Sequence, residues 1–171
     1  MATIPPPAPT PFPWVDLIII LALVALNGVF AMSELAIVSA RKPRLQAMEK
    51  AGKRGAKSAL QLAADPGKFL STVQIGITTI GILNGVVAES ALSTPVALWL
   101  ENLGVAHETS GWLASTLIVV IITYLSIVLG ELVPKRIGQT NPEPIARIVA
   151  KPMLTLALVA RPLVRLLSGS T

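Results

Sequence analysis

Three long apolar segments constrain what this chain can fold into. They run roughly over residues 14–40, within residues 67–100, and over residues 111–133. About 20 apolar residues in a helix cross the hydrocarbon core of a bilayer, so each segment is long enough to span a membrane. Only 13% of the 171 residues are charged, whereas a soluble domain carries about 25%. The sequence therefore predicts an all-α membrane protein with three transmembrane helices, the second interrupted at Pro95 and the third ended by Pro134.

The basic residues all fall on one side of these segments. Residues 1–13 and 101–110 contain no Lys or Arg, eight lie in residues 41–68, and the remaining six follow Pro134. By the positive-inside rule the N-terminus is predicted to be outside and the C-terminus cytoplasmic. Residues 1–13 are rich in proline, which predicts an extended external leader before a transmembrane domain over residues 14–171. The chain has no cysteine, which excludes disulfides and thiolate metal sites.

Two further segments, over about residues 41–63 and 142–168, are predicted to be juxtamembrane helices. The first is polar and is interrupted by Gly52 and Gly55. The second is amphipathic, and its longest uncharged stretch, nine residues, is far too short to cross a bilayer. Both segments are expected to lie against the membrane surface and to contact anionic lipids, whereas no partner nucleic acid is expected.

In the juxtamembrane segment over residues 142–168, a helical projection places the basic residues along one line and the apolar residues opposite them. Two prolines, Pro152 and Pro162, are expected to kink this helix. The basic residues are Arg147, Lys151, Arg161 and Arg165, and the apolar ones are Ile148, Met153, Leu156, Val159, Leu163 and Leu166.

Three carboxylates, Glu34, Glu89 and Glu131, lie inside the apolar segments, where no Lys or Arg is expected at membrane depth. A charged side chain at the middle of a membrane helix costs at least about 2.5–3.5 kcal/mol, so a bound cation or a proton is the expected compensation. Oxygen ligands of this kind suit Mg²⁺, Ca²⁺ or Na⁺. Neighbouring polar candidates are Asn27, Ser33, Asn84 and Ser126.

Glu131 has two interpretations. Pro134 has no N–H, so the carbonyl of Gly130 is expected to be released from the helical ladder beside the Glu131 carboxylate, as at ion sites in broken transporter helices. Alternatively, Glu131 forms an ion pair with Lys135 or Arg136 at the cytoplasmic interface.

The other candidates have alternatives too. Asn84 lies between Gly81 and Gly85 and is either a ligand or the donor of an interhelical hydrogen bond. The Ser33 hydroxyl is either a ligand or bonded to the carbonyl four residues before it, and Glu34 is close enough to the inner end to reach Arg41 or Lys42. Glu89 has three interpretations: it lies at the external mouth of the ion path, it contacts a second subunit, or it is simply solvated. Because Asn84 lies deep in its segment, a separate short helix over residues 69–77 is expected at the cytoplasmic mouth, with Gly76 and Gly81 favouring the break after it.

The motifs NGVFAMSELAIVS from Asn27, GELVPK from Gly130 and the stretch around Asn84-Gly85, taken in this order, resemble the transmembrane domain of the CNNM (cyclin M)/CorC family. The resemblance implies a homodimer of three-span subunits that exports Mg²⁺, coupled to Na⁺ entry, with dehydrated Mg²⁺ held among the three helices. By motif, the ligands would be Ser33, Asn84, Glu131 and the backbone carbonyl of Gly130. Many members carry serine where Ala31 stands, so Ser33 would have to supply that hydroxyl.

Family members usually continue into cytoplasmic CBS domains, and none is expected within these 171 residues. The predicted protein is a multi-pass plasma-membrane Mg²⁺ transporter. The alternative is a membrane anchor or regulator that senses Mg²⁺ without moving it. An enzyme is not expected, because the sequence has neither a G-x-S-x-G nor an H-E-x-x-H motif.

Overall fold

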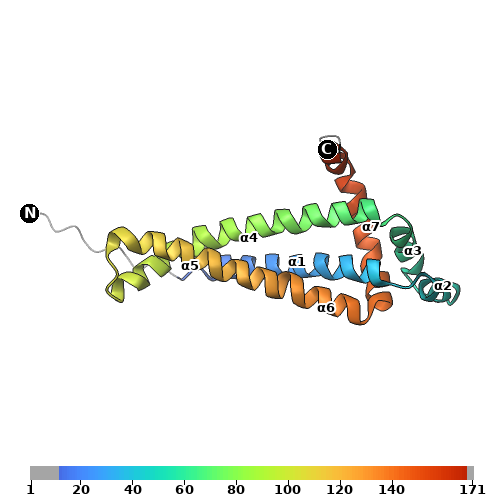
Figure 1. Ribbon diagram of the computed structural model, residues 1–171, viewed down its shortest axis with the longest axis horizontal. Helices are drawn as coiled ribbons and strands as arrows, with labels where there is room; N and C mark the ends of the chain where they lie inside the picture. The colour runs from blue at the N-terminus through green and yellow to red at the C-terminus, as the bar shows by residue number, and fades with distance from the viewer. Residues whose placement is uncertain (1–11, 169–171) are drawn as a thin grey trace, which may run out of the picture.

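The computed structural model describes residues 12–168, with side chains over residues 12–159 apart from that of Lys68. Every regular element within these residues is a helix. The expected external leader falls almost entirely outside them. Three helical segments are long and apolar enough to cross a membrane, which confirms the predicted fold class. Figure 1 shows them running alongside one another as an elongated bundle.

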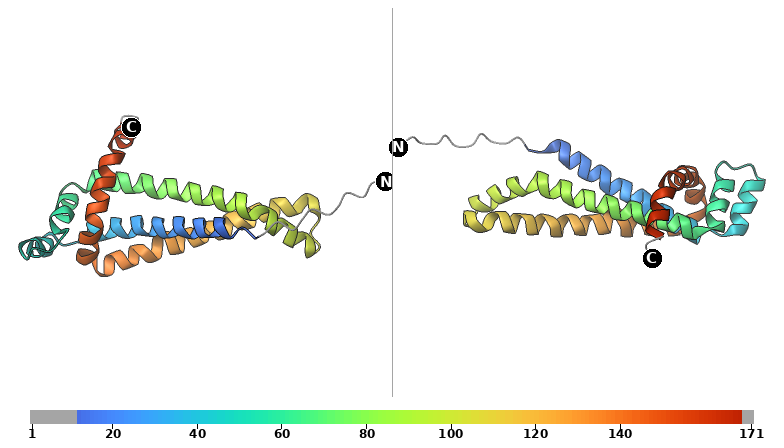
Figure 2. Two further views of the ribbon diagram at one scale, coloured as in Figure 1. Left: turned by 180° about the vertical axis from the view of Figure 1, so that it is seen from behind. Right: turned by 90° about the horizontal axis from the view of Figure 1, so that it is seen from above.

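The first span, α1 (Trp14–Ser39), is an uninterrupted helix. The second, α4 (Pro66–Asn102), is also one helix, so the expected separate helix over residues 69–77 is wrong. Gly76 does not break α4 because its backbone stays helical. Its missing side chain instead admits the ring of Phe30, which would lie 2.5 Å from a Cβ added at Gly76. Pro95 likewise lies within α4, which bends in its yellow-green part (Figure 2).

The third span is built from three consecutive pieces. They are α5 (His107–Ile127), a π-helical turn η1 (Val128–Leu132), and α6 (Val133–Thr140). The expected end at Pro134 is therefore wrong. Pro134 lies in the first turn of α6, and the wider π-helical turn before it accommodates a residue that cannot donate a backbone hydrogen bond. The helix consequently runs on to Thr140.

The remaining helices gather at one end of the bundle, which we call the basic end. They are α2 (Lys42–Lys50), α3 (Ala56–Ala64) and α7 (Pro142–Ser168). Positive φ angles at Gly52 and Gly55 separate α2 from α3, as the sequence predicted. Most of the buried core lies here, and its larger members include Phe30, Ile37, Leu45, Leu62, Phe69, Val73, Val149 and Met153.

The predicted amphipathic helix over residues 142–168 is confirmed as α7, which crosses the ends of the spans (Figure 1). Its buried face comprises Ala146, Val149, Ala150 and Met153. Ile148 and Val159 are 67% and 71% exposed, so the expected single apolar face is divided between packing and an outward surface. The side chains of Arg161, Arg165, Leu163 and Leu166 lie outside those that the structure describes.

The half of the bundle away from the basic end presents apolar side chains outward. Ile18, Ile82, Val86 and Trp112 are each more than 60% exposed. A water-soluble protein rarely exposes contiguous apolar surface of this kind. Acyl chains of a bilayer solvate such side chains, so the surface suits a protein that spans the membrane.

Candidate cation site

An open cavity of about 260 Å³ lies among the three spans. Its polar lining comes from α1, α5 and η1, and two glycines of α4 leave room for it. These residues are Asn27, Thr123, Ser126, Glu131, Gly81 and Gly85. Thr123 and Ser126 are three positions apart, so one helical face of α5 supplies both hydroxyls. Ile77, Ile122 and Ile127 complete the lining. The cavity therefore combines apolar side chains with a few oxygen-bearing side chains from helices that are distant in sequence.

The π-helical turn places a backbone carbonyl beside this cavity. The side-chain amide of Asn27 donates a hydrogen bond of 3.1 Å to the Gly130 carbonyl oxygen. Pro134 has no N–H to offer that carbonyl, and the Asn27 amide acts as a donor to it instead. A Cβ on residue 130 would lie 3.3 Å from the Asn27 nitrogen, so glycine permits the close approach.

Two buried amide oxygens next to this turn lack a partner. Asn84 is 2% exposed and donates through its nitrogen to the Ser126 hydroxyl at 2.8 Å. Its Oδ1 accepts no hydrogen bond, and neither does Oδ1 of Asn27, among the residues that the structure describes. An unpaired buried acceptor costs about 1–3 kcal/mol. Amide oxygens are also ligands for hard cations, so both atoms are chemically suited to binding one.

The carboxylates of Glu34 and Glu131 share one lysine. Nζ of Lys135 lies 2.7 Å from Oε1 of Glu131 and 3.4 Å from Oε2 of Glu34. The expectation that these carboxylates lack a basic neighbour is therefore wrong, and the alternative ion pair between Glu131 and Lys135 is confirmed. Glu34 pairs with Lys135 rather than with Arg41 or Lys42.

Close packing of α6 on α1 explains this pairing. A Cβ on Gly138 would lie 2.5 Å from the Met32 carbonyl oxygen, and one on Gly28 would lie 3.0 Å from the Pro134 ring. Because both contacts exclude a side chain, the two helices approach closely enough for Lys135 to reach across to Glu34.

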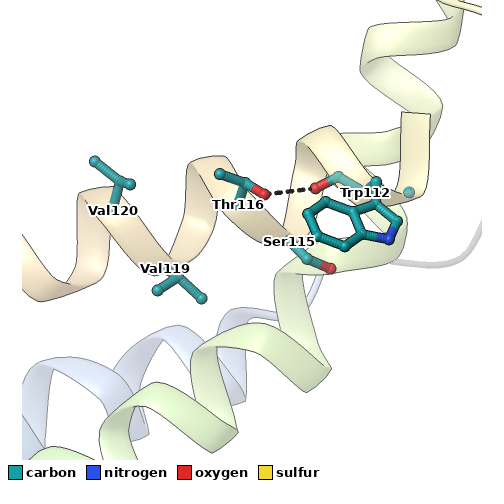
Figure 3. Close-up of a pocket in the computed structure, with 6 residues that line it drawn as sticks. Trp112, Ser115, Thr116, Val119 and Val120 are labelled. Carbon is teal, nitrogen blue, oxygen red and sulfur yellow. Dashed lines mark hydrogen bonds between the residues drawn. The ribbon is translucent and has the colours of Figure 1, made fainter. Parts of the chain in front are cut away.

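The structure does not bring Ser33 or Glu89 into the cavity. The Ser33 hydroxyl is buried and donates to the carbonyl of Val29, four residues earlier, at 2.6 Å. This is the alternative that the sequence left open. Glu89 accepts a hydrogen bond of 3.0 Å from Ser115. Ser115 lines a larger, mostly apolar groove of about 430 Å³ on α5, together with Trp112 and Val119 (Figure 3).

Three residues of the candidate site line the cavity, namely Asn27, Ser126 and Glu131. The other three adjoin them: Gly130 bonds to Asn27, Asn84 bonds to Ser126, and Glu34 shares Lys135 with Glu131. Sequence reasoning missed Thr123, although its spacing from Ser126 indicated the shared face, and it missed that Lys135 bridges two carboxylates. Within residues 12–159, no three His, Cys, Asp or Glu side chains converge on a metal position. A bound cation would consequently depend on amide, hydroxyl and backbone oxygens as well as carboxylates.

Comparison with known proteins places the chain in a family. The model of the cyclin M transmembrane N-terminal domain matches residues 18–171. A UPF0053 protein of Synechocystis is 51% identical over 156 residues, which cover 91% of this chain and 35% of the relative. The polyamine export protein of Salmonella typhimurium is 35% identical over 154 residues, covering 90% of this chain and 34% of that protein. The chain spans about a third of the length of these relatives. With its three membrane-crossing helices and this match over most of its length, the chain belongs to the CNNM transmembrane domain family and is a multi-pass membrane protein.

Proposed function

We propose that this chain is the membrane unit of a cation exporter and that its cargo is Mg²⁺. The observation that carries the proposal is the cavity among the spans, which Asn27, Ser126 and Glu131 line. Asn84 bonds to Ser126, and Glu34 shares Lys135 with Glu131. Among the described residues, Oδ1 of Asn27 and Oδ1 of Asn84 accept no hydrogen bond. A protein interior tolerates such a group of acceptors when a cation binds them.

The available ligand atoms favour a hard cation. Asn84, Glu131 and the Gly130 carbonyl offer oxygen only, and Mg²⁺ accepts such ligands in octahedral geometry at about 2.0–2.1 Å. Six waters occupy about 180 Å³, so a cavity of about 260 Å³ has room for the ion to enter hydrated. Exchange of those waters for protein oxygens would then give the dehydrated ion that the family resemblance implies.

The proposed transport runs from the basic end towards the opposite end of the bundle. The concentration of Lys and Arg at the basic end supports a cytoplasmic location for it, and the same basic residues suit anionic lipid headgroups. Coupling to Na⁺ entry, a homodimeric assembly and a plasma-membrane location are proposed on the family resemblance.

Polyamine export is the second candidate. Lys135 itself is a primary alkylammonium, and it lies between Glu34 and Glu131 at 3.4 and 2.7 Å. An ammonium group of a polyamine has the same chemistry and would suit the same carboxylates. The name of the relative from Salmonella typhimurium adds weight to this candidate.

Flux through purified protein in liposomes separates these functions. An internal Mg²⁺ indicator reports Mg²⁺ flux down an imposed gradient, with and without an opposing Na⁺ gradient, and radiolabelled spermidine is tested in parallel. Asn84→Ala should abolish Mg²⁺ flux, whereas Ser90→Ala, which removes an exposed hydroxyl from the same helix, should not.

Each contrary outcome has its own meaning. Saturable spermidine flux without Mg²⁺ flux would establish the second candidate. Mg²⁺ binding without flux would establish a sensor or regulator. Mg²⁺ flux that Asn84→Ala leaves intact would show that transport occurs but that the site is wrongly assigned.

A further inference from the structure

Among the residues that the structure describes, Lys135 is the only one whose ammonium group contacts Glu34 or Glu131. Its side chain is 27% exposed, and those of Glu34 and Glu131 are 19% and 35% exposed. All three are therefore partly withdrawn from water, where charge interactions are stronger than at an open surface. The neighbouring basic residue, Arg136, is exposed and forms no ion pair with these carboxylates.

One ammonium group cannot balance two carboxylates. With both carboxylates ionised, Glu34, Glu131 and Lys135 carry a net charge of minus one. The uncompensated negative charge lies mainly at Glu34. Its Oε2 atom is buried and receives no well-directed hydrogen bond, although Nζ of Lys135 lies 3.4 Å away. Lys135 is directed mainly at Glu131, at 2.7 Å.

A divalent cation changes this balance. If it joined the group while Lys135 stayed, the net charge would become plus one, and two cations would repel each other across a few ångströms. If Lys135 left, one divalent cation would neutralise both carboxylates. Charge balance thus favours exchange of the lysine for the cargo over simultaneous occupation.

We infer that Lys135 is a tethered counter-cation that occupies the carboxylates of Glu34 and Glu131 when the cargo is absent and is displaced when a divalent cation binds. The inference rests on the proposed function and gives Lys135 a positioning role within it. Lys135 lowers the affinity for the cargo, and its return to the carboxylates promotes release. The Lys135 side chain lies on α6, directly after the π-helical turn, and is partly exposed, so its ammonium group is not enclosed by the protein.

Lys135→Gln tests this exchange. The variant should bind Mg²⁺ about tenfold more tightly in equilibrium titration of purified protein, since it removes a competing charge at short range. In liposomes it should reach half-maximal flux at lower Mg²⁺ but with a lower maximal rate. Arg136→Gln removes the same charge one residue away and should change neither the Mg²⁺ affinity nor the flux. Lys135→Arg should retain the weaker binding. Unchanged or weaker Mg²⁺ binding by Lys135→Gln would overturn the inference.

A measurement on the unmodified protein guards against a variant that fails to fold. An amine-reactive ester, with mass spectrometry of the peptides, reports how freely each lysine reacts. Saturating Mg²⁺ should increase the labelling of Lys135 several-fold and leave exposed Lys53 unchanged. A decrease or no change at Lys135 while Mg²⁺ is bound would contradict displacement but leave Mg²⁺ transport standing. Absence of Mg²⁺ binding to both the unmodified protein and Lys135→Gln would overturn the proposed function and the inference together.

Discussion

Asn27 on α1 and Gly130 on η1, 103 positions apart in the sequence, are joined by one buried hydrogen bond of 3.1 Å. The bond fastens the first span to the π-helical turn of the third. It also fixes the Gly130 carbonyl directly before Glu131, which lines the cavity. Oδ1 of the same Asn27 side chain accepts no hydrogen bond among the residues that the structure describes. The shape of the candidate site therefore depends on a contact between two polar groups inside the membrane.

Replacing Asn27 with alanine should destabilise the protein and impair transport. The substitution leaves the Gly130 carbonyl without its side-chain donor, at a cost of about 1–3 kcal/mol. Thermal unfolding in detergent should show a lower Tm, and Mg²⁺ flux should fall. Thr116→Val is the control, because Thr116 is exposed and bonds only to a carbonyl of its own helix. An Asn27→Ala protein as stable and active as this control would show that the bond has no structural weight.

Replacing Gly138 with alanine should destabilise the contact between α6 and α1. Alanine favours a helix over glycine by about 1 kcal/mol, yet its Cβ would lie 2.5 Å from the Met32 carbonyl oxygen. Gly111→Ala, also within a helix, meets nothing within 4 Å and should be neutral or stabilising. Opposite shifts in Tm are the expected result. Equal stabilisation by both substitutions would mean that α6 packs less closely than described.

Glu143 should matter more to stability than its partner Arg44. Glu143 is 4% exposed, accepts a hydrogen bond from the backbone N–H of Arg41 and lies 3.7 Å from the Arg44 guanidinium. Glu143→Ala removes the acceptor for a backbone donor and should cost about 1–3 kcal/mol. Arg44→Gln removes a partner that is 65% exposed and should cost less than about 1 kcal/mol.

Limited trypsin digestion measures this difference. Loss of Glu143 should release the junction between α1 and α2 from α7 and accelerate cleavage at basic sites within residues 41–57. Similar digestion rates for Glu143→Ala and Arg44→Gln would argue against a joining role for Glu143.

Ser33→Ala should change Mg²⁺ flux less than about twofold. The hydroxyl of Ser33 donates to Val29 of its own helix. Unlike Asn84, which bonds to the lining residue Ser126, Ser33 neither lines the cavity nor bonds to a residue that lines it, so its loss removes no ligand that the structure indicates. Asn84→Ala, measured in the same liposome assay, sets the scale of a full ligand loss. A comparable loss in both variants would restore Ser33 to the ligand set that the family resemblance implies.

The sequence alone predicted the architecture well. Three spans, the interrupted segment over residues 41–63 and the amphipathic helix over residues 142–168 all follow from local composition. Local prediction failed where glycine and proline were assumed to break a helix. Gly76, Pro95 and Pro134 lie inside continuous helical segments, since packing against neighbours and a π-helical turn compensate for what these residues lack.

The sequence determined which polar groups enter the membrane, because the length and apolarity of a span are local properties. Only the tertiary structure decided how those groups pair. Asn84 meets Ser126 between α4 and α5. Asn27 meets Gly130 and Lys135 reaches Glu34 because glycines at helix crossings set how closely α1 approaches η1 and α6. Such distances depend on packing between segments about a hundred residues apart, and no spacing within one helix records them.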